Sequence, residues 1–164
     1  ATYSGAIPFV GIHMIDLMRW VGGREFIRGV AAQANVSRQD QIGEMEDNAG
    51  ALLELDNGGT ATLRLDYLRP ETASTHGDDR LRLAGSKGVL EVRSADDFIG
   101  VITEERGAFR PDVPAPAPFF GQFLDSLAGR TEPPVSAADA FRVAEICLRL
   151  RDSADEGALV PLSG

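Results

Sequence analysis

The spacing of apolar residues changes twice along this chain, from a helical period to a strand period and back again. Between residues 11 and 22, apolar side chains recur at i, i+3, i+4 and i+7, which is the spacing of one helix face. These side chains are Met14, Leu17, Met18 and Val21. In the middle of the chain apolar and polar residues alternate instead, as in strands that bury one face. This order of elements predicts an α+β domain whose helices collect on one face of a sheet.

The strand pattern is strongest on either side of the turn Asp56-Asn57-Gly58-Gly59. In the runs 49–55 and 61–67 the apolar residues hold the odd positions, which predicts a β-hairpin. Further strands are expected at about 25–38, 80–83, 89–92 and 98–104. Because the connections are short, we expect an open, largely antiparallel mixed sheet of five or six strands.

Two more helices are expected after the strands. Four prolines between residues 111 and 118 form a stiff bridge that cannot join a sheet interior. An apolar stripe then predicts a helix at about 119–128. Ser136 with Asp139 resembles a capping box and predicts the start of a third helix, which Gly157 closes. Since all three helices have one apolar stripe, they can cover the same sheet face, and the other face is left to solvent or to a partner.

Charge and composition exclude several classes of function. The 25 acidic and 16 basic residues give a net charge of -9, which repels phosphate backbones and anionic headgroups, so neither nucleic acid nor a membrane is an expected partner. No apolar stretch approaches the roughly 20 residues that span a bilayer, and a cytoplasmic protein is expected. The single cysteine, Cys147, is interpreted as a buried core thiol. Two histidines and one cysteine are too few for a His/Cys zinc site, so no metal is expected.

Two phosphate-binding motifs are absent from the sequence. A chain that binds a dinucleotide by itself is expected to contain G-x-G-x-x-G between a strand and a helix, and no such stretch is present. The motif G-x-x-x-x-G-K-[ST] is absent as well, and Gly85-Ser86-Lys87-Gly88 is interpreted as a hairpin turn. We therefore expect no cofactor-binding residue and no Rossmann domain in this chain.

Residues 11–23 resemble the G-x-H-x-x-D-x-x-x-W-x-x-G helix of the Gfo/Idh/MocA oxidoreductases. Later features of that family follow in the same order. They are a hairpin around Gly58-Gly59, a G-x-x-G-x-L-x-V segment from Gly85 to Val92, and a closing helix that ends with Leu150-Arg151-Asp152-Ser153-Ala154 before Val160-Pro161-Leu162. The resemblance covers nearly the whole chain and implies the C-terminal α/β domain of such an enzyme.

The resemblance also implies a function for residues 1–164 as a single domain for substrate binding and oligomerisation. In that family a preceding Rossmann domain binds NAD or NADP, so the cofactor is expected in a full-length protein and not for this chain alone. The expected substrate is a sugar, a polyol or a related hydroxy compound. A homodimer or higher oligomer is expected through the sheet face that the helices leave open.

His13 is the catalytic residue that the resemblance implies. An imidazole suits this role because it exchanges a proton near neutral pH while a hydride moves to the cofactor. One position departs from the family pattern: many members carry an aspartate four residues before this histidine, where this sequence has Phe9. A phenyl ring cannot orient or charge an imidazole.

Five further residues are candidates for the site. Asp16 is expected to anchor the helix by bonding to the backbone or to Arg19, and Trp20 is expected to pack, so both are assigned supporting roles. Tyr67, Arg69 and His76 follow the end of a strand and are candidate ligands for substrate hydroxyl groups, with an ordinary solvated loop as the alternative.

Two other classes of function remain open at this point. The chain can be a non-catalytic dimerisation or binding module with a vestigial site, as Phe9 suggests. A free-standing carbohydrate-binding domain is a weaker alternative, because two tyrosines and one tryptophan offer few aromatic platforms.

Overall fold

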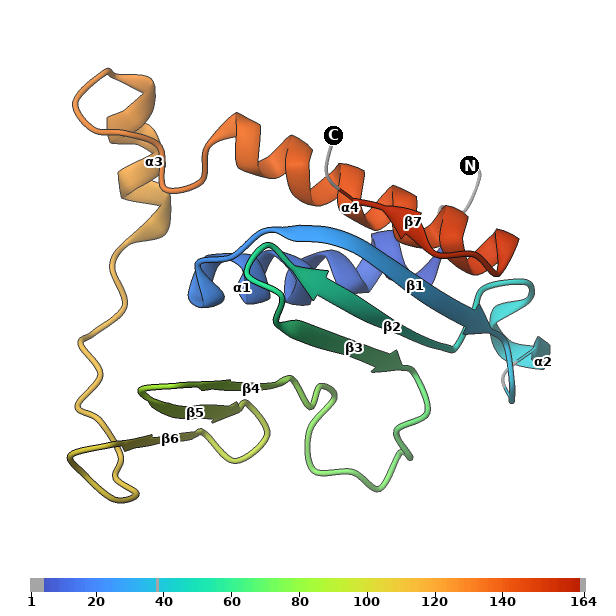
Figure 1. Cartoon of the computed structure of the whole chain (residues 1–164), viewed down its shortest axis with the longest axis horizontal. Coiled ribbons are helices and arrows are strands. Elements are labelled where there is room, and N and C mark those ends of the chain that lie inside the picture. Colours follow the sequence, from blue (N-terminus) through green and yellow to red (C-terminus); the bar gives the residue numbers. More distant parts are fainter. Residues whose placement is uncertain (1–4, 38, 163–164) are drawn as a thin grey trace. The chain divides into compact units, whose positions relative to one another are not determined.

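The computed structural model in Figure 1 describes residues 5–37 and 39–162. The chain divides into two compact units, Ala1–Leu68 with Asp125–Gly164, and Arg69–Leu124. The first unit contains the π-helix η1 (Ile7–Gly11), the helices α1 (Ile12–Gly22), α2 (Gln39–Ile42) and α4 (Ala137–Glu156), and the strands β1 (Phe26–Ala34), β2 (Asn48–Leu55), β3 (Thr60–Asp66) and β7 (Val160–Pro161). The second contains β4 (Arg80–Gly85), β5 (Gly88–Arg93) and β6 (Phe98–Thr103), and α3 (Phe119–Leu127) crosses the boundary.

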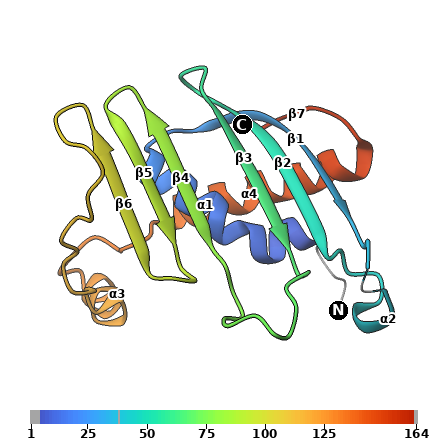
Figure 2. The ribbon, with the colours of Figure 1, turned by 90° about the horizontal axis from the view of Figure 1, so that it is seen from below.

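Both sheets are antiparallel, and their strand orders, β3-β2-β1-β7 and β4-β5-β6, can be followed in Figure 2. The α+β class is confirmed. The described residues form seven strands in two sheets, against the expected five or six, because β7 is too short to leave a periodic pattern in the sequence. The predicted hairpin is confirmed as β2 and β3, whose odd residues face the core: Leu63 lies opposite Ala51 and Leu65 opposite Ala49.

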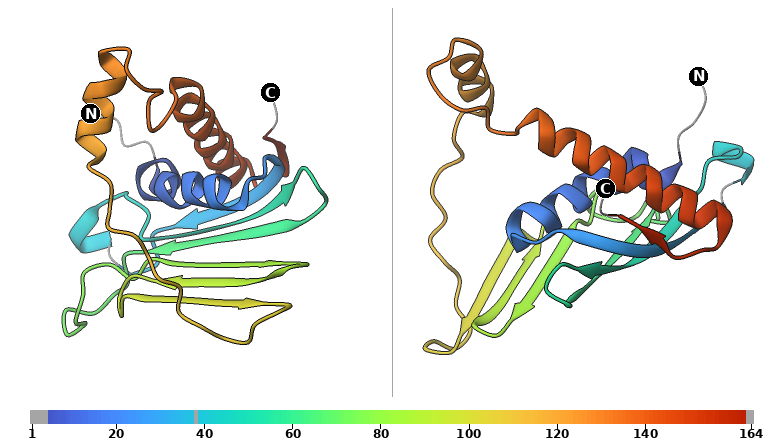
Figure 3. Two further views of the ribbon diagram at one scale, coloured as in Figure 1. Left: turned by 90° about the vertical axis from the view of Figure 1, so that its left-hand side faces the viewer. Right: turned by 45° about the horizontal axis from the view of Figure 1, so that its top comes forward.

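Helices α1 and α4 lie on one face of the four-stranded sheet (Figure 3). α4 buries Val143, Ile146, Cys147 and Leu150 against that face. The capping interaction predicted at its start is present, since the backbone N–H of Asp139 donates to the Ser136 hydroxyl at 3.0 Å. No helix in the described part of the chain has both the length and the apolar composition of a bilayer-spanning segment.

The buried face of α1 differs from the expected stripe. Ile15 is its one fully buried residue, Met14 and Met18 are partly buried against the core, and Val21 is 37% exposed. The reason is a close approach at Gly11, where an added Cβ would lie 3.0 Å from Cδ2 of Leu65. Gly11 ends η1, so the chain comes this near to β3 just before α1 begins, and Ile15 follows one turn later on the core side.

A second close approach sets α4 on β1. A Cβ at Gly29 would lie 3.1 to 3.2 Å from the side chains of Leu53, Leu150 and Leu162, so a larger residue there would push these leucines back by a few tenths of an ångström. One turn further along α4, the buried Ser153 hydroxyl accepts the backbone N–H of Ala31 at 3.0 Å and donates to the carbonyl of Ala158 at 2.5 Å. Ser153 therefore joins the helix, the central strand and the turn into β7.

A buried carboxylate holds the connection between β1 and β2. Asp47 is fully buried and accepts the backbone N–H groups of Val36 and Ser37, each at 2.9 Å, and the Ser37 hydroxyl at 3.1 Å. These charge-assisted hydrogen bonds compensate the cost of burying the carboxylate.

The second unit is a three-stranded meander with little buried apolar surface. Leu81 is its buried apolar residue, and the Arg93 guanidinium covers the Phe98 ring at 4.0 Å. In the G-x-x-G turn, a Cβ at Gly88 would lie 2.2 Å from the carbonyl oxygen of Ile102. This clash is the reason why the position is occupied by glycine. α3 has no buried residue among those described.

We predict that Ser153→Ala lowers the free energy of unfolding by about 1 to 3 kcal/mol, because it leaves a buried N–H and a carbonyl without partners. Urea denaturation followed by circular dichroism measures the change. Ser86→Ala, in an exposed turn, is the control and should change the value little. Equal values for the two variants would contradict the structural role of Ser153.

Candidate functional site

The side of α1 that faces away from the core carries the predicted site residues. His13 and Trp20 lie within about 20° of each other around the helix axis. Asp16 lies between them along the helix, and Phe9 precedes them on η1. His13 is exposed, Phe9 is 60% exposed and Trp20 is 79% exposed, whereas Asp16 is half-buried. The structure thus brings the imidazole, the carboxylate and the indole together on one face. The expected packing of Trp20 is not found among the described residues.

Ion pairs tie the C-terminal end of α1 to β1 and α4. Nε of Arg19 donates to Oε1 of Glu25 at 3.0 Å, and Arg19 lies 3.5 Å from Asp139 at the start of α4. Glu25 also pairs with Arg142, which donates to the Phe26 carbonyl at 3.1 Å. Asp16 is expected to bond to the backbone or to Arg19, and the Arg19 guanidinium is paired with Glu25 and Asp139. These contacts join the C-terminal end of α1 to the start of β1 and to α4.

The two carboxyl groups of this cluster, on Glu25 and Asp139, have pKa values below their ordinary values. Burial alone would raise the pKa of the Glu25 carboxyl, but hydrogen bonds and attraction from Arg19 and Arg142 hold that pKa below its ordinary value of 4.5. The hydrogen bond from the Ser136 hydroxyl and the charge of Arg19 lower the pKa of Asp139. Both carboxylates therefore stabilise the fold in their ionised forms.

The remaining site candidates belong to the segment after β3. Tyr67, in the first unit, has a buried hydroxyl without a hydrogen-bond partner among the described residues, and burial raises its pKa. Arg69 and His76 belong to the second unit. Nε of Arg69 donates to the Thr75 carbonyl at 2.8 Å, and Nη1 lies 3.1 Å from Asp78. Arg69 therefore closes a loop, and His76 lies exposed on that loop.

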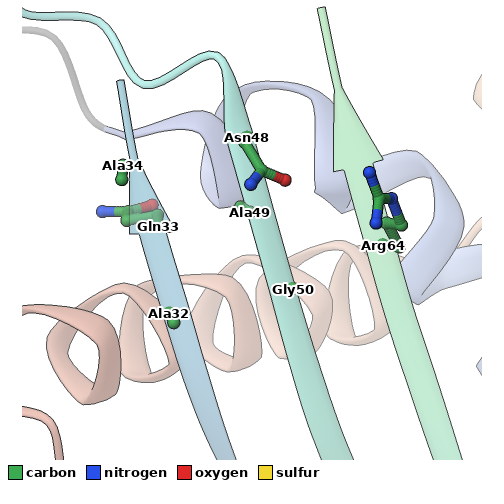
Figure 4. Close-up of a pocket in the computed structure, with 7 residues that line it drawn as sticks. All are labelled: Ala32, Gln33, Ala34, Asn48, Ala49, Gly50 and Arg64. Carbon is green, nitrogen blue, oxygen red and sulfur yellow. The ribbon is translucent and has the colours of Figure 1, made fainter. Parts of the chain in front are cut away.

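Sequence reasoning missed a hollow on the open face of the four-stranded sheet (Figure 4). It is shallow, with a volume of about 340 Å³, and Ala32, Ala34 and Gly50 form much of its floor. Asn48 and Arg64 add polar groups around it. The signal in the sequence was the run of small residues in two strands, but their alignment depends on the register, which pairs Ala32 with Gly50.

Two other chemistries were considered for the described residues. Burial raises the pKa of the Cys147 thiol to about 12, which agrees with an unreactive core cysteine. Within residues 5–37 and 39–162, no three His, Cys, Asp or Glu side chains gather in a way that could hold a metal ion.

These features define a class of protein: an α+β domain that covers one face of an antiparallel sheet with two helices and turns a histidine-bearing helix face outward. The chain belongs to the GFO/IDH/MocA C-terminal domain family, whose model matches residues 1–91. A comparison with curated proteins finds no match.

Solved structures with the same fold extend this comparison. A "putative oxidoreductase" from Thermotoga maritima is 35% identical, with a TM-score of 0.91 over 98% of this chain. The aldose-aldose oxidoreductase from Caulobacter crescentus, complexed with glycerol, is 25% identical, with a TM-score of 0.73 over 96% of the chain. An Agrobacterium radiobacter oxidoreductase in complex with NAD⁺, L-tartaric acid and magnesium shares the fold at 21% identity and a TM-score of 0.77 over 95%. The chain spans about half of each of these proteins, at 48%, 47% and 48% of their lengths.

We predict that Glu25→Gln destabilises the chain at neutral pH and has a smaller effect in acid. A carboxyl whose pKa is lowered by folding stabilises the fold above its unfolded pKa and loses this contribution as the pH falls through the folded pKa. Urea unfolding of both proteins at about pH 7 and about pH 3.5 measures the difference. Glu104→Gln, at an exposed position, is the control. A difference that does not change with pH would contradict the prediction.

Proposed function

We propose that this chain is the substrate-binding and oligomerisation domain of an NAD(P)-dependent oxidoreductase that acts on a sugar, a polyol or a related hydroxy compound. The observation that carries the proposal is the outward row of His13, Asp16 and Trp20. A helix that buries Ile15 on one side and exposes an imidazole and an indole on the other is suited to a site that a second domain completes.

Two relatives support the chemistry of the proposal. The Caulobacter enzyme, an aldose-aldose oxidoreductase, was crystallised with glycerol, which is a polyol. The Agrobacterium oxidoreductase, similar in fold, was crystallised with NAD⁺. We therefore propose a hydroxy compound as substrate and NAD or NADP as the cofactor of the longer protein. We propose that the longer protein acts in the cytoplasm.

The chain itself does not fit a dinucleotide. Its sequence has no G-x-G-x-x-G segment, and all strand pairings among the described residues are antiparallel, whereas a dinucleotide-binding unit needs parallel strands around a glycine-rich turn. The proposed partner is a Rossmann domain of the same polypeptide. When bound there, the nicotinamide accepts or supplies the hydride.

His13 has the proposed role of general base and acid. Its ring takes the proton of the substrate hydroxyl when the alcohol is oxidised and returns a proton to the carbonyl oxygen in the reverse direction. Asp16 and Trp20 lie on the same helix face and shape the space around the ring. Tyr67 and His76 are proposed to contact substrate hydroxyl groups. Arg69 is proposed to act mainly through the loop that it closes, since its guanidinium already binds Thr75 and Asp78.

One observation favours the second candidate, a non-catalytic dimerisation or binding module. Phe9 occupies the position four residues before His13 where the family resemblance implies an aspartate, and it is 60% exposed. No carboxylate at this position orients the imidazole. Turnover measurements on a His13 variant separate the two candidates.

The open face of the four-stranded sheet is the proposed oligomer surface. Thr60, Thr62, Arg64 and Asp66 of β3 are all exposed, as the sequence pattern predicts. Their neighbours on β1 and β2 continue the same face. We propose that the chain forms a homodimer or a higher oligomer through this surface.

We predict that the 164-residue chain alone binds neither NADH nor NADPH tightly, because its sequence has no G-x-G-x-x-G turn to direct a helix N-terminus at the pyrophosphate. Isothermal titration calorimetry with both nucleotides tests this. A dissociation constant on the order of micromolar for either nucleotide would falsify the two-domain proposal.

We predict that His13→Ala, in the complete polypeptide that contains this chain, lowers kcat by about 10² to 10⁴, the usual contribution of a general acid or base. Cofactor affinity and the thermal unfolding midpoint should change little, because the side chain is exposed. Steady-state kinetics and fluorescence titration of the cofactor measure the two effects. An unchanged kcat would remove His13 from the chemistry and favour the non-catalytic module.

A further inference from the structure

The turn between β2 and β3 contains an asparagine followed by a glycine, Asn57-Gly58, and both residues are exposed (Figure 2). A side-chain amide in this position can cyclise onto the next residue, because glycine has no side chain that shields its main-chain nitrogen. The two other asparagines of the sequence have different neighbours. Asn35 is followed by the β-branched Val36, and Asn48 begins strand β2. Asn57 is therefore the asparagine whose amide carbon is most accessible to its own backbone.

A hydrogen bond within the turn favours attack on the Asn57 amide. The Gly59 N–H donates to Oδ1 of Asn57 at 3.0 Å and so folds the side chain back over the turn. Oδ1 is also the atom that gains negative charge when a nucleophile attacks Cγ, and a donor already in place stabilises that charge. The Gly58 N–H donates to the Leu55 carbonyl at 3.0 Å, and this bond has to open before the nitrogen reacts. Because the turn is exposed, such an opening disturbs no core residue.

We propose that Asn57 is a site of spontaneous deamidation, which converts it to an aspartyl or an isoaspartyl residue. The Gly58 nitrogen gives its proton to water and bonds to Cγ of Asn57. The Cγ–Nδ2 bond then breaks, and the side-chain nitrogen takes a proton from water and leaves as ammonia. Water opens the resulting cyclic imide at either carbonyl carbon: attack at Cγ gives aspartate, and attack at the main-chain carbonyl gives isoaspartate, whose main chain is longer by one carbon. The reaction needs no reagent except water and is independent of the proposed enzymatic function.

The modified turn is attached to the connection between α1 and β1. The Asp56 N–H donates to the Glu25 carbonyl at 2.9 Å, and Nη1 of Arg24 lies 3.8 Å from Oδ1 of Asp56. The Glu25 carboxylate in turn accepts a hydrogen bond from Arg19 of α1. An isoaspartyl residue at position 57 lengthens the main chain of the turn and so weakens this support of α1. An aspartyl residue keeps the main chain and an acceptor oxygen, so it leaves the support in place.

Ageing of the purified chain at neutral pH tests the assignment. Peptide mass spectrometry measures the conversion at each of the three asparagines, and enzymatic methylation of isoaspartyl groups identifies that product. Asn57 should convert about 10-fold or more faster than Asn35 and Asn48, because it combines a glycine neighbour with a donor on its amide oxygen. Asn57→Ser is the matched control and should give no isoaspartate in this turn. Equal rates at the three asparagines, or an Asn57 that stays intact, would overturn the proposal.

Thermal unfolding of the separated products tests the consequence for the fold. Both products add one negative charge to the net charge of -9, so chromatography separates them from the unmodified chain. Asn57→Asp carries the same added charge with a normal main chain and should unfold near the wild-type temperature. The isoaspartyl form should unfold at a lower temperature than Asn57→Asp, because only its main chain is altered. Equal unfolding temperatures of these two forms would overturn the inferred link between the turn and α1.

Discussion

The close approach of α4 to β1 is the constraint on which the first unit depends. Gly29 favours this approach, because a Cβ there would lie only 3.1 to 3.2 Å from three leucine side chains. The Ser153 hydroxyl links α4 to β1 by accepting the Ala31 N–H, and it links α4 to the turn before β7 by donating to the Ala158 carbonyl. With α4 in this position, one sheet face is filled by the core. The opposite face is left with short side chains, a hollow and two internal ion pairs.

Helix α1 has a side that packs against the core and an opposite side that carries the proposed site residues. Gly11 and Ile15 bring one side against β3 and the core, while His13 and Trp20 point away. The ion pairs of Arg19 and Glu25 hold this orientation at the C-terminal end of the helix. A catalytic or binding group needs such a rigid support, since small errors in its position weaken its effect on a reaction. The proposed role of His13 therefore depends on the packing of Ile15 against the core, on the opposite side of α1.

Much of the secondary structure could be predicted because its signals are local. The β2–β3 hairpin follows from the alternation of apolar residues, and the start of α4 follows from Ser136 and Asp139. The stripe predicted for α1 was partly wrong, because several of its residues are apolar and only the contact at Gly11 selects the buried side. The sequence suggested that Asp16 bonds to the backbone or to Arg19, but it gave no sign that Arg19 pairs with Glu25, which lies beyond the helix. The hollow could not be predicted from the sequence because residues of three strands, β1, β2 and β3, line it.

The sequence by itself determined the class of fold, the family and the helix that bears His13, because periodicity and motif spacing are properties of neighbouring residues. Only the tertiary structure decided which side of that helix is buried and which sheet face stays open. It also decided that Ala32 and Gly50 form one depression beside Leu52. These features depend on strand register and on close packing at Gly11 and Gly29, and both are set by contacts between residues that are far apart in the chain.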